Sequence, residues 1–383
     1  MKITYILNSG SYGGMEQHVL DLVESMVVKG HEVYVWCPQG VIAEDSKRLG
    51  AKVTLRKIKF DVDPFYILSL KKFLKENQID IVHAHELKAS TNAMIAAKLA
   101  GTEYRISHTH TPISEWQIAP LKKKLNLFVY PKIINNFATY EIALTESRKR
   151  IKEKEGIRKE KLYIVESPNA IKIENFVLED SVRDEHKNYI LDKYGLGEET
   201  VIWGCLGRLT EEKGHHILLE AFKMFLDDLP DEEKEKHHLK FTGGGHLQER
   251  FQERAKELDI ESNITITGRF LDEDKIKHYA SFNYFIHPSM AEGFGIVLIE
   301  AMTVGIPVIA SNLEVFKEVA DDTVTYFETG NAKHLSEVMK KVHKGEIKTH
   351  EMKKRAQKRV IDNYTYDKFA DNYDQFYLDL KNC

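Results

Sequence analysis

Within this 383-residue chain, the fold is decided by Pro288-Ser-Met-Ala-Glu292-Gly-Phe-Gly295-Ile-Val-Leu-Ile-Glu300-Ala-Met-Thr-Val-Gly305-Ile-Pro307-Val-Ile-Ala-Ser311. The apolar run 282–286 before it predicts a buried strand, and the apolar run that starts at Ile296 predicts a helix. Gly293 and Gly295 lie between them and allow the backbone to approach a ligand closely. The stretch therefore predicts a strand, a glycine loop and a helix in succession.

The start of that helix is predicted to bind an anion. Its first amide groups have no partners inside the helix and lie at the positive end of the helix dipole, so they attract phosphate. Glu292 precedes the helix and Glu300 lies more than one turn inside it, so the two carboxylates reach different parts of one ligand. Carboxylates suit sugar hydroxyls better than phosphate. The pattern therefore favours a nucleotide-sugar.

Length and composition indicate a multidomain, globular chain. A prior of about 150 residues per domain predicts two or three domains. The opening run 1–7 is too short for a signal peptide or a membrane helix, and no later apolar run is long enough to span a bilayer. Cys37, Cys205 and Cys383 show no metal-ligand spacing. We therefore expect reduced, buried thiols in a cytoplasmic protein.

Charge is distributed unevenly between the two halves of the chain. The net charge is −4, but residues 1–170 hold 26 Lys and Arg against 19 Asp and Glu, which gives +7, and the remainder holds 29 against 40, which gives −11. Basic residues concentrate at 122–124, between Leu121 and Leu125. Two interpretations stay open: peripheral contact with the anionic inner face of a membrane, or a solvated helix face. We expect no nucleic-acid partner.

Short apolar runs alternate with helical periods along the chain, which is typical of parallel α/β sheets. The predicted strands are 2–7, 32–37, 79–83, 104–108 and 142–144, followed by 201–206, 239–242, 264–266, 282–286 and 307–310. This pattern predicts two Rossmann-like, doubly wound domains, 1–170 and 171–364, that face each other across a ligand-binding cleft. Aromatic residues at helical spacing predict a C-terminal helix at about 365–383 that crosses back to the first domain.

Taken together, these motifs resemble the retaining glycosyltransferases of the GT-B fold, family 4 type (glycosyl transferases group 1), which include exopolysaccharide and glycan assembly enzymes. Glu292 and Glu300 match the family's two glutamates separated by seven residues. The segment 9–16 resembles its amino-terminal glycine loop, and the segment 204–214 resembles its diphosphate-clamping segment. Several motifs in the right order make this resemblance more specific than any glycine pair alone.

The resemblance implies a metal-independent hexosyltransferase without a cofactor, which moves a sugar from a nucleotide diphosphate, UDP by default, to a glycan or lipid-linked acceptor. In such an enzyme Arg208 and Lys213 stabilise the leaving diphosphate. Glu292 accepts hydrogen bonds from the transferred sugar, and His110 contacts that sugar near the reacting centre. The other implied donor-binding residues are Gly13, Gly14, Gly207, Arg269, Phe270, Gly293, Phe294, Gly295, Ile296 and Glu300.

Other protein classes compete with this interpretation. A GT-B partner subunit could bind nucleotide-sugar without transferring the sugar, although the set of Arg208, Lys213, Glu292 and Glu300 argues against it. A sugar-nucleotide epimerase of related fold would release nucleotide without forming a glycoside. A dinucleotide-dependent oxidoreductase is disfavoured because the first strand leads into no G-x-G-x-x-G. The sequence identifies neither the sugar nor the acceptor.

Two histidine pairs raise the question of a metal. His83 and His85, and likewise His108 and His110, alternate along predicted strands and could ligate zinc together. No nearby Cys or acid completes a set of ligands, so we predict no metal site.

Other titratable pairs have structural explanations. Asp61 and Asp63 mimic the metal-binding acids of a different glycosyltransferase fold, but Asp63 before Pro64 is better explained as a helix N-cap. The histidine pairs 215–216 and 237–238 are expected in exposed loops.

Overall fold

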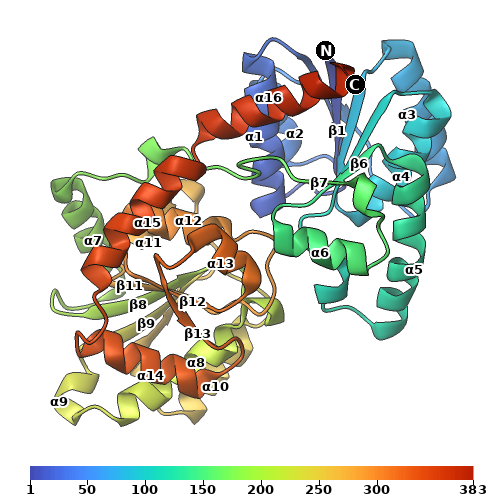
Figure 1. The fold of residues 1–383 in the computed structure, drawn as a ribbon. Coiled ribbons are helices and arrows are strands. Elements are labelled where there is room, and N and C mark those ends of the chain that lie inside the picture. The colour runs from blue at the N-terminus through green and yellow to red at the C-terminus, as the bar shows by residue number, and fades with distance from the viewer. Residues whose placement is uncertain (383) are drawn as a thin grey trace. The chain divides into compact units, whose positions relative to one another are not determined.

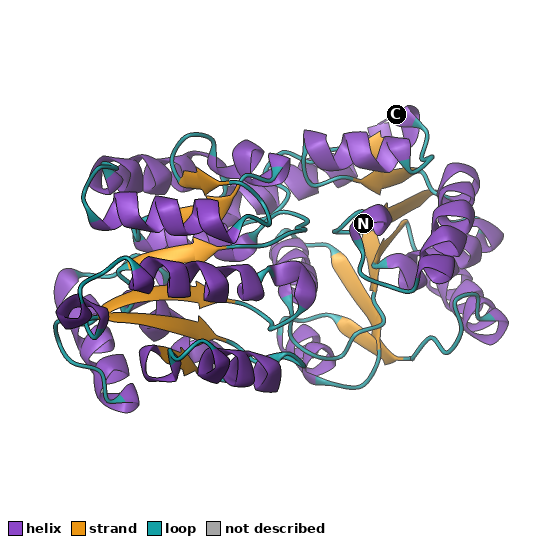
Figure 2. Cartoon of the chain, turned by 90° about the horizontal axis from the view of Figure 1, so that it is seen from below, coloured by secondary structure: helices purple, strands orange, loops and turns teal. Residues whose placement is uncertain are grey.

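The structure, a computed structural model, describes residues 1–382. The chain divides into two compact units, one formed by Met1–Ala170 with the C-terminal segment from Asp367, and one formed by Ile171–Tyr366. Each unit contains one parallel sheet (Figure 1). In Figure 2 the strands of the second unit lie between helices on both sides. Such cover on both faces explains why most strand residues are buried.

The first unit is built on a seven-stranded sheet with the order β3-β2-β1-β4-β5-β6-β7. Its strands are β1 Lys2–Ile6, β2 Glu32–Cys37, β3 Lys52–Leu55, β4 Ile81–His85, β5 Tyr104–His108, β6 Tyr140–Ile142 and β7 Leu162–Tyr163. Neighbouring strands pair in parallel throughout. The strand order changes direction between β1 and β4, and ligands of such sheets bind outside the carboxyl ends of the strands at this point.

Helices connect the strands of the first unit. They are α1 Gly14–Val28, α2 Val41–Arg48, α3 Pro64–Asn77, α4 Leu87–Ala100, α5 Pro120–Phe137 and α6 Glu146–Lys154. The predicted N-cap of α3 is confirmed, because the Asp63 carboxylate accepts a hydrogen bond of 3.1 Å from the amide of Tyr66. Its second oxygen accepts the amide of Lys59 at 3.0 Å.

The C-terminal helix α16, Tyr366–Asn382, belongs to the core of the first unit (Figure 1). Its buried apolar residues share one cluster with β1 and α1; they are Phe369, Tyr373, Phe376, Tyr377 and Leu380. Each such side chain contributes about 1.5–3 kcal/mol by leaving water. The Tyr377 hydroxyl lies 3.2 Å from that of Tyr5 and 2.7 Å from Nδ1 of His83. The first unit is therefore completed by the end of the chain.

The second unit repeats the same topology with six strands in the order β10-β9-β8-β11-β12-β13. The strands are β8 Val201–Leu206, β9 His237–Thr242, β10 Ile264–Ile266, β11 Tyr284–His287, β12 Val308–Ser311 and β13 Thr325–Phe327. The helices are α7 Asp180–Tyr194, α8 His215–Asp227, α9 Asp231–Lys234, α10 Gln248–Glu257, α11 Lys275–Ala280, α12 Ile296–Val304, α13 Glu314–Ala320, α14 Ala332–His343 and α15 Thr349–Asn363. Here the strand order changes direction between β8 and β11.

Three of the four histidines predicted in exposed loops are buried. His237 and His238 belong to β9, and His215 begins α8; only His216 is exposed. Hydrogen bonds offset the burial in the strand: Trp203 Nε1 donates to His237 Nδ1 at 3.1 Å, and His238 Nε2 lies 2.8 Å from the Thr265 hydroxyl. The prediction was wrong because polarity alone does not reveal a tertiary partner.

The remaining sequence expectations concern the state of the cysteines and the presence of a membrane-spanning helix. Cys37 and Cys205 are buried, free thiols, as predicted, and Cys383 lies outside the described residues. Within residues 1–382 there is no helix with both the length and the apolar character needed to cross a bilayer.

Candidate functional site

Two loops of the second unit meet at the point where the strand order changes direction. One follows β8 and ends at Gly214, and the other follows β11 and ends at Gly295. They are joined through the backbone carbonyl of Glu212, which accepts the amides of Met290 at 2.8 Å and Ala291 at 3.4 Å. Segments about 80 residues apart in sequence therefore form one surface at the carboxyl ends of the strands.

Lys213 and Glu292 form an ion pair between these loops. Their side chains are 22% and 12% exposed. The same carboxylate oxygen accepts a hydrogen bond of 3.3 Å from the Ser289 hydroxyl and lies 3.5 Å from Nε2 of His287. Burial alone would raise the pKa of Glu292, but the neighbouring Lys213 and His287 hold that pKa below its ordinary value. The carboxylate is therefore ionised at neutral pH and accepts hydrogen bonds only.

Glu300 lies on the second turn of α12 and is 5% exposed. Tyr279 donates its hydroxyl to one carboxylate oxygen at 2.8 Å, and Lys275 approaches the other oxygen at 3.3 Å. The charge of Glu300 raises the pKa of Lys275 above its ordinary value. Because a carboxylate accepts about four hydrogen bonds, these two donors orient Glu300 and leave acceptor capacity for a ligand's hydroxyls. Nothing in the sequence pattern pointed to either donor.

Glycine is required at two positions of these loops. Gly295, the N-cap of α12, has φ +94°, and a Cβ there would lie 2.7 Å from the Phe316 ring. Gly214 has φ +67°, and a Cβ there would lie 2.0 Å from the carbonyl oxygen of Pro288. Any side chain would therefore separate the loops or distort the start of α12. Phe294 is 3% exposed and packs against Tyr364, so only its backbone is placed to serve a ligand.

Further glycines bring the ends of the neighbouring strands together. A Cβ on Gly243 would lie 2.1 Å from the carbonyl oxygen of Gly207, and the amide of Gly207 donates to Thr242 at 3.0 Å. Gly243 also pairs with Gly268 in an isolated bridge. Loops after β8, β9 and β10 are thus in direct backbone contact. A Cβ on Gly244 would lie 3.0 Å from the Arg269 side chain, and a Cβ on Gly245 would lie 2.3 Å from the carbonyl oxygen of Leu209. These close approaches explain the triple glycine 243–245 beside the diphosphate-clamping segment 204–214.

The predicted ligand-binding side chains of Arg208, Arg269 and Phe270 differ in their exposure to solvent. Arg208 and Arg269 are exposed. Phe270 is half-buried, and its ring lies 5.1 Å from that of His278. Ile296 is the first residue of α12, and Gly293 is buried in the loop before it. These positions leave both guanidinium groups accessible to an anion.

The predicted residues of the first unit surround its own point of strand reversal. Gly13 is the N-cap of α1, and Gly14 is its first residue. His110 is partly exposed and follows β5 by two residues. Glu86, which the sequence analysis missed, caps α4 with φ +67°, and burial raises the pKa of its carboxyl to about 7. A non-glycine residue in this conformation is uncommon, and such strain concentrates at functional sites.

A buried ion pair fixes the segment that carries His110. Lys152 and Glu141 are 1% and 0% exposed and pair directly. Lys152 also donates to the carbonyl and the hydroxyl of Thr109, at 2.6 and 2.8 Å. Glu141 accepts the Thr109 hydroxyl at 2.6 Å and its amide at 3.2 Å. Thr109 is thus held from both sides, immediately before His110. The sequence offered no signal for this pair beyond two charges in a basic region.

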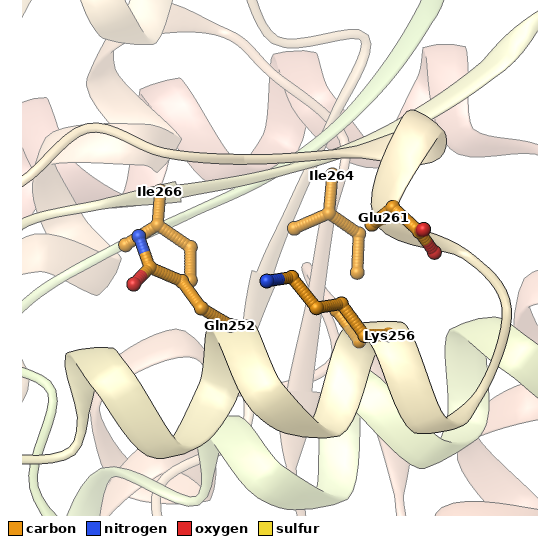
Figure 3. Close-up of a pocket in the computed structure, with 6 residues that line it drawn as sticks. Gln252, Lys256, Glu261, Ile264 and Ile266 are labelled. Atoms are coloured by element: carbon orange, nitrogen blue, oxygen red, sulfur yellow. The ribbon is translucent and has the colours of Figure 1, made fainter.

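A surface hollow of about 340 Å³ lies elsewhere in the second unit, between α10 and β10 (Figure 3). Gln252 and Lys256 face it from the helix, and Ile264 and Ile266 face it from the strand. None of the predicted ligand-binding residues lines it. The hollow is therefore separate from the candidate site.

Comparison with known proteins places both units in one family. Residues 12–172 match the family model "Glycosyltransferase Family 4", and residues 187–359 match "Glycosyl transferases group 1". A phosphatidyl-myo-inositol mannosyltransferase of Mycolicibacterium smegmatis is 29% identical over 325 residues, which cover 81% of this chain and 75% of the relative. The putative glycosyltransferase EpsF of Bacillus subtilis is 28% identical over 64% of this chain and 61% of its own length.

Solved structures agree on the fold. The Anabaena protein HepE, in complex with UDP and glucose, superimposes with a TM-score of 0.84 at 19% identity, covering 99% of this chain and 100% of that one. WaaG, a glycosyltransferase involved in lipopolysaccharide biosynthesis, gives a TM-score of 0.74 at 17% identity, with 96% and 98% coverage. The two family models together match most of the sequence, and the two parallel-sheet units agree with the fold of these solved structures. The chain therefore belongs to the GT-B glycosyltransferases of family 4 type.

Proposed function

We propose that this glycosyltransferase moves a hexose from a nucleotide-diphosphate sugar to a glycan or lipid-linked acceptor in cell-surface polysaccharide or glycoconjugate synthesis, with retention and without a metal ion. The observation that carries the proposal is the Lys213–Glu292 pair beside the first amides of α12, with Glu300 one turn further. This arrangement offers cations and amides to a diphosphate and acceptors to hydroxyls.

The donor's base is the least constrained part of the proposal. UDP is proposed because it is common in the family, and HepE provides an example of a neighbour in complex with UDP. A relative from Mycolicibacterium smegmatis is named as a GDP-mannose-dependent mannosyltransferase acting on a phosphatidylinositol monomannoside. UDP and GDP donors must therefore both be tested.

The reaction breaks the bond between the anomeric carbon and the diphosphate oxygen. Negative charge develops on the leaving diphosphate, where Arg208, Lys213 and the amides at the start of α12 stabilise it. Glu292 orients the sugar by accepting hydrogen bonds from its hydroxyls. The acceptor hydroxyl forms the new bond on the face that the diphosphate leaves, and its proton passes to a diphosphate oxygen. This front-side route needs no carboxylate nucleophile.

A donor screen tests the proposal directly. UDP- and GDP-linked hexoses are incubated with the enzyme and with lipid-linked or oligosaccharide acceptors, and products are identified by mass spectrometry. We expect one donor to yield a glycoside whose anomeric configuration equals that of the donor. That donor, at about 100 times its dissociation constant, should add about 2.7 kcal/mol to the free energy of unfolding. Binding without a glycoside would favour a partner subunit, and a converted donor sugar would favour an epimerase.

Removal of divalent metal is expected to leave transfer largely intact. The Asp63 carboxylate, half of the acid pair that resembles a metal motif, already accepts the amide of Tyr66 as the N-cap of α3 and the amide of Lys59 from the preceding loop. Arg208 and Lys213 are placed to supply the positive charge instead. Initial rates are compared with and without excess EDTA. Complete loss of activity, restored by Mn²⁺, would contradict metal independence.

An exposed face of α5 favours contact with an anionic bilayer. Leu121, Leu125 and Phe128 recur at helical spacing and are 82%, 56% and 62% exposed. Lys132 lies on the same face one turn later, with Nζ 3.4 Å from the centre of the Phe128 ring. The adjacent lysines 122–124 border this apolar stripe. Apolar residues bordered by lysines match the interfacial pattern of peripheral membrane helices.

Replacement of Lys122, Lys123 and Lys124 by serine is therefore expected to weaken vesicle binding. Each lysine near an anionic surface contributes about 1 kcal/mol, so the triple variant should bind at least tenfold more weakly at low salt. Co-sedimentation with phosphatidylserine vesicles at two ionic strengths measures this. The matched control replaces the exposed lysines 341, 344 and 354 of the second unit. If both variants bind the vesicles equally well, the lysines of α5 form an ordinary solvated helix face and do not contact the membrane.

A further inference from the structure

Four histidines converge inside the first unit. His18 comes from α1, His85 ends β4, His108 ends β5, and His110 follows two residues later. One ring nitrogen of each lies within 4.8 Å of the corresponding nitrogens of the others. His85 and His108 are paired in register across β4 and β5. No sequence pattern indicated His18, which takes the place of His83 in the cluster; Nδ1 of His83 lies 2.7 Å from the Tyr377 hydroxyl instead.

Several nitrogens of this four-histidine cluster have no hydrogen-bond partner among the described residues. They are Nε2 of His18, Nε2 of His85 and both ring nitrogens of His108. These three side chains are 2%, 0% and 0% exposed, so bulk solvent does not reach them. A neutral imidazole offers one N–H and one lone pair, and an unused lone pair in a buried site is unfavourable.

The surroundings of His18 resemble those of a metal ligand. The side-chain oxygen of Asn169 lies 2.8 Å from Nδ1 of His18. An amide oxygen can only accept a hydrogen bond, so it fixes the proton on Nδ1 and directs the lone pair of Nε2 into the cluster. Metal-bound histidines commonly have such a second partner.

The geometry is close to that of a bound ion without being closed around one. Nδ1 of His85 and Nε2 of His110 are 3.3 Å apart, which is also within hydrogen-bond distance. Two nitrogens at about 2.05 Å from a tetrahedral ion are separated by about 3.3 Å. The rings of His108 and His110 stack at 4.1 Å between centroids, so one must turn before both direct lone pairs to the same ion. His110 is partly exposed and gives an ion a route inward.

We propose that His18, His85, His108 and His110 bind one Zn²⁺ ion, and that the bound ion inhibits the enzyme by withdrawing His110 from the donor sugar. Neutral nitrogen ligands select zinc and its neighbours over magnesium or calcium, which prefer oxygen. The claim that zinc inhibits transfer rests on the proposed function, whereas the claim that the four histidines bind zinc does not.

Metal binding is measured on the full chain after it has been stripped with EDTA. Isothermal titration with Zn²⁺ should give one ion per chain, and Co²⁺ in its place should give the intense visible bands of a four-coordinate ion. His108→Gln should abolish binding. Asn169→Ala, which keeps all four ligands, should lower the affinity by about 10- to 100-fold. His350→Gln, at an exposed position of α15, should leave it unchanged.

The outcomes separate the two halves of the proposal. No zinc binding by the wild type, a six-coordinate Co²⁺ spectrum, or equal loss in His350→Gln would overturn the metal site. The Co²⁺ spectrum of the wild type decides this even if His108→Gln fails to fold. Zinc should then suppress transfer reversibly, and Asn169→Ala should need about 10- to 100-fold more zinc for the same suppression. Tight binding without suppression would overturn the inhibitory role, and absence of transfer with every donor would overturn the proposed function alone.

Discussion

Replacing Arg208 by alanine is expected to lower kcat by about 10²- to 10³-fold, which corresponds to about 2.7–4 kcal/mol of lost transition-state stabilisation. Arg208 is exposed on the loop after β8, where the strand order of the second unit changes direction. Lys213 on the same loop is already engaged by Glu292, so the guanidinium is the more available cation for the leaving diphosphate. The negative charge develops only as the bond breaks, so Arg208 stabilises the transition state more than the bound substrate. Its loss should therefore lower kcat.

Steady-state kinetics and thermal unfolding on the same preparation test this expectation. The stability of the Arg208→Ala variant should stay within about 0.5 kcal/mol of the wild type, because the side chain is exposed. Arg250→Ala is the matched control, since Arg250 is an exposed arginine on α10 of the same unit. Turnover within twofold of the wild type would refute the catalytic role of Arg208. An equal loss in the control would indicate a general charge effect.

Replacing Lys152 by methionine is expected to lower the free energy of unfolding by about 3–5 kcal/mol, because it leaves a buried carboxylate without its counter-charge. Glu141 is 0% exposed and would keep the hydrogen bonds from the hydroxyls of Thr109 and Tyr130, but no second cation among residues 1–382 pairs with it. The Lys152 ammonium also holds the backbone of Thr109. The variant should therefore loosen the segment that carries His110 as well as the fold.

Urea denaturation of three variants measures this. Lys154→Met, on an exposed position of the same helix, should change stability by no more than about 0.5 kcal/mol. The double variant Glu141→Leu with Lys152→Met should recover much of the loss, because replacing both members of a buried pair by apolar residues is often nearly neutral. A single variant as stable as the wild type would show that the pair contributes nothing. If the double variant is no more stable than Lys152→Met, the lost stability comes from altered packing and not from the unpaired carboxylate.

Much of the second unit could be predicted from local patterns. The boundaries of β8 and β10 match the predicted strands, and the glycine loop before α12 follows from Gly293 and Gly295. Other strands are displaced: β4 begins two residues later than predicted, and β6 lies two residues earlier. Their ends are set by pairing with β1 and β5, which a window of sequence does not contain. The short strands β3, β7 and β13 were missed for the same reason.

The sequence by itself determined the alternation of strands and helices, the glycines that require positive φ, and the order of charged residues around them, because each depends on neighbours in the chain. Only the tertiary structure decided which of those charges are paired. Lys213 meets Glu292, Lys152 meets Glu141, and His18 joins His85 across 67 residues of chain. Such contacts arise when a parallel sheet brings residues that are distant in sequence close together. Because a buried polar group without a partner is unfavourable, the loss of either partner then lowers stability.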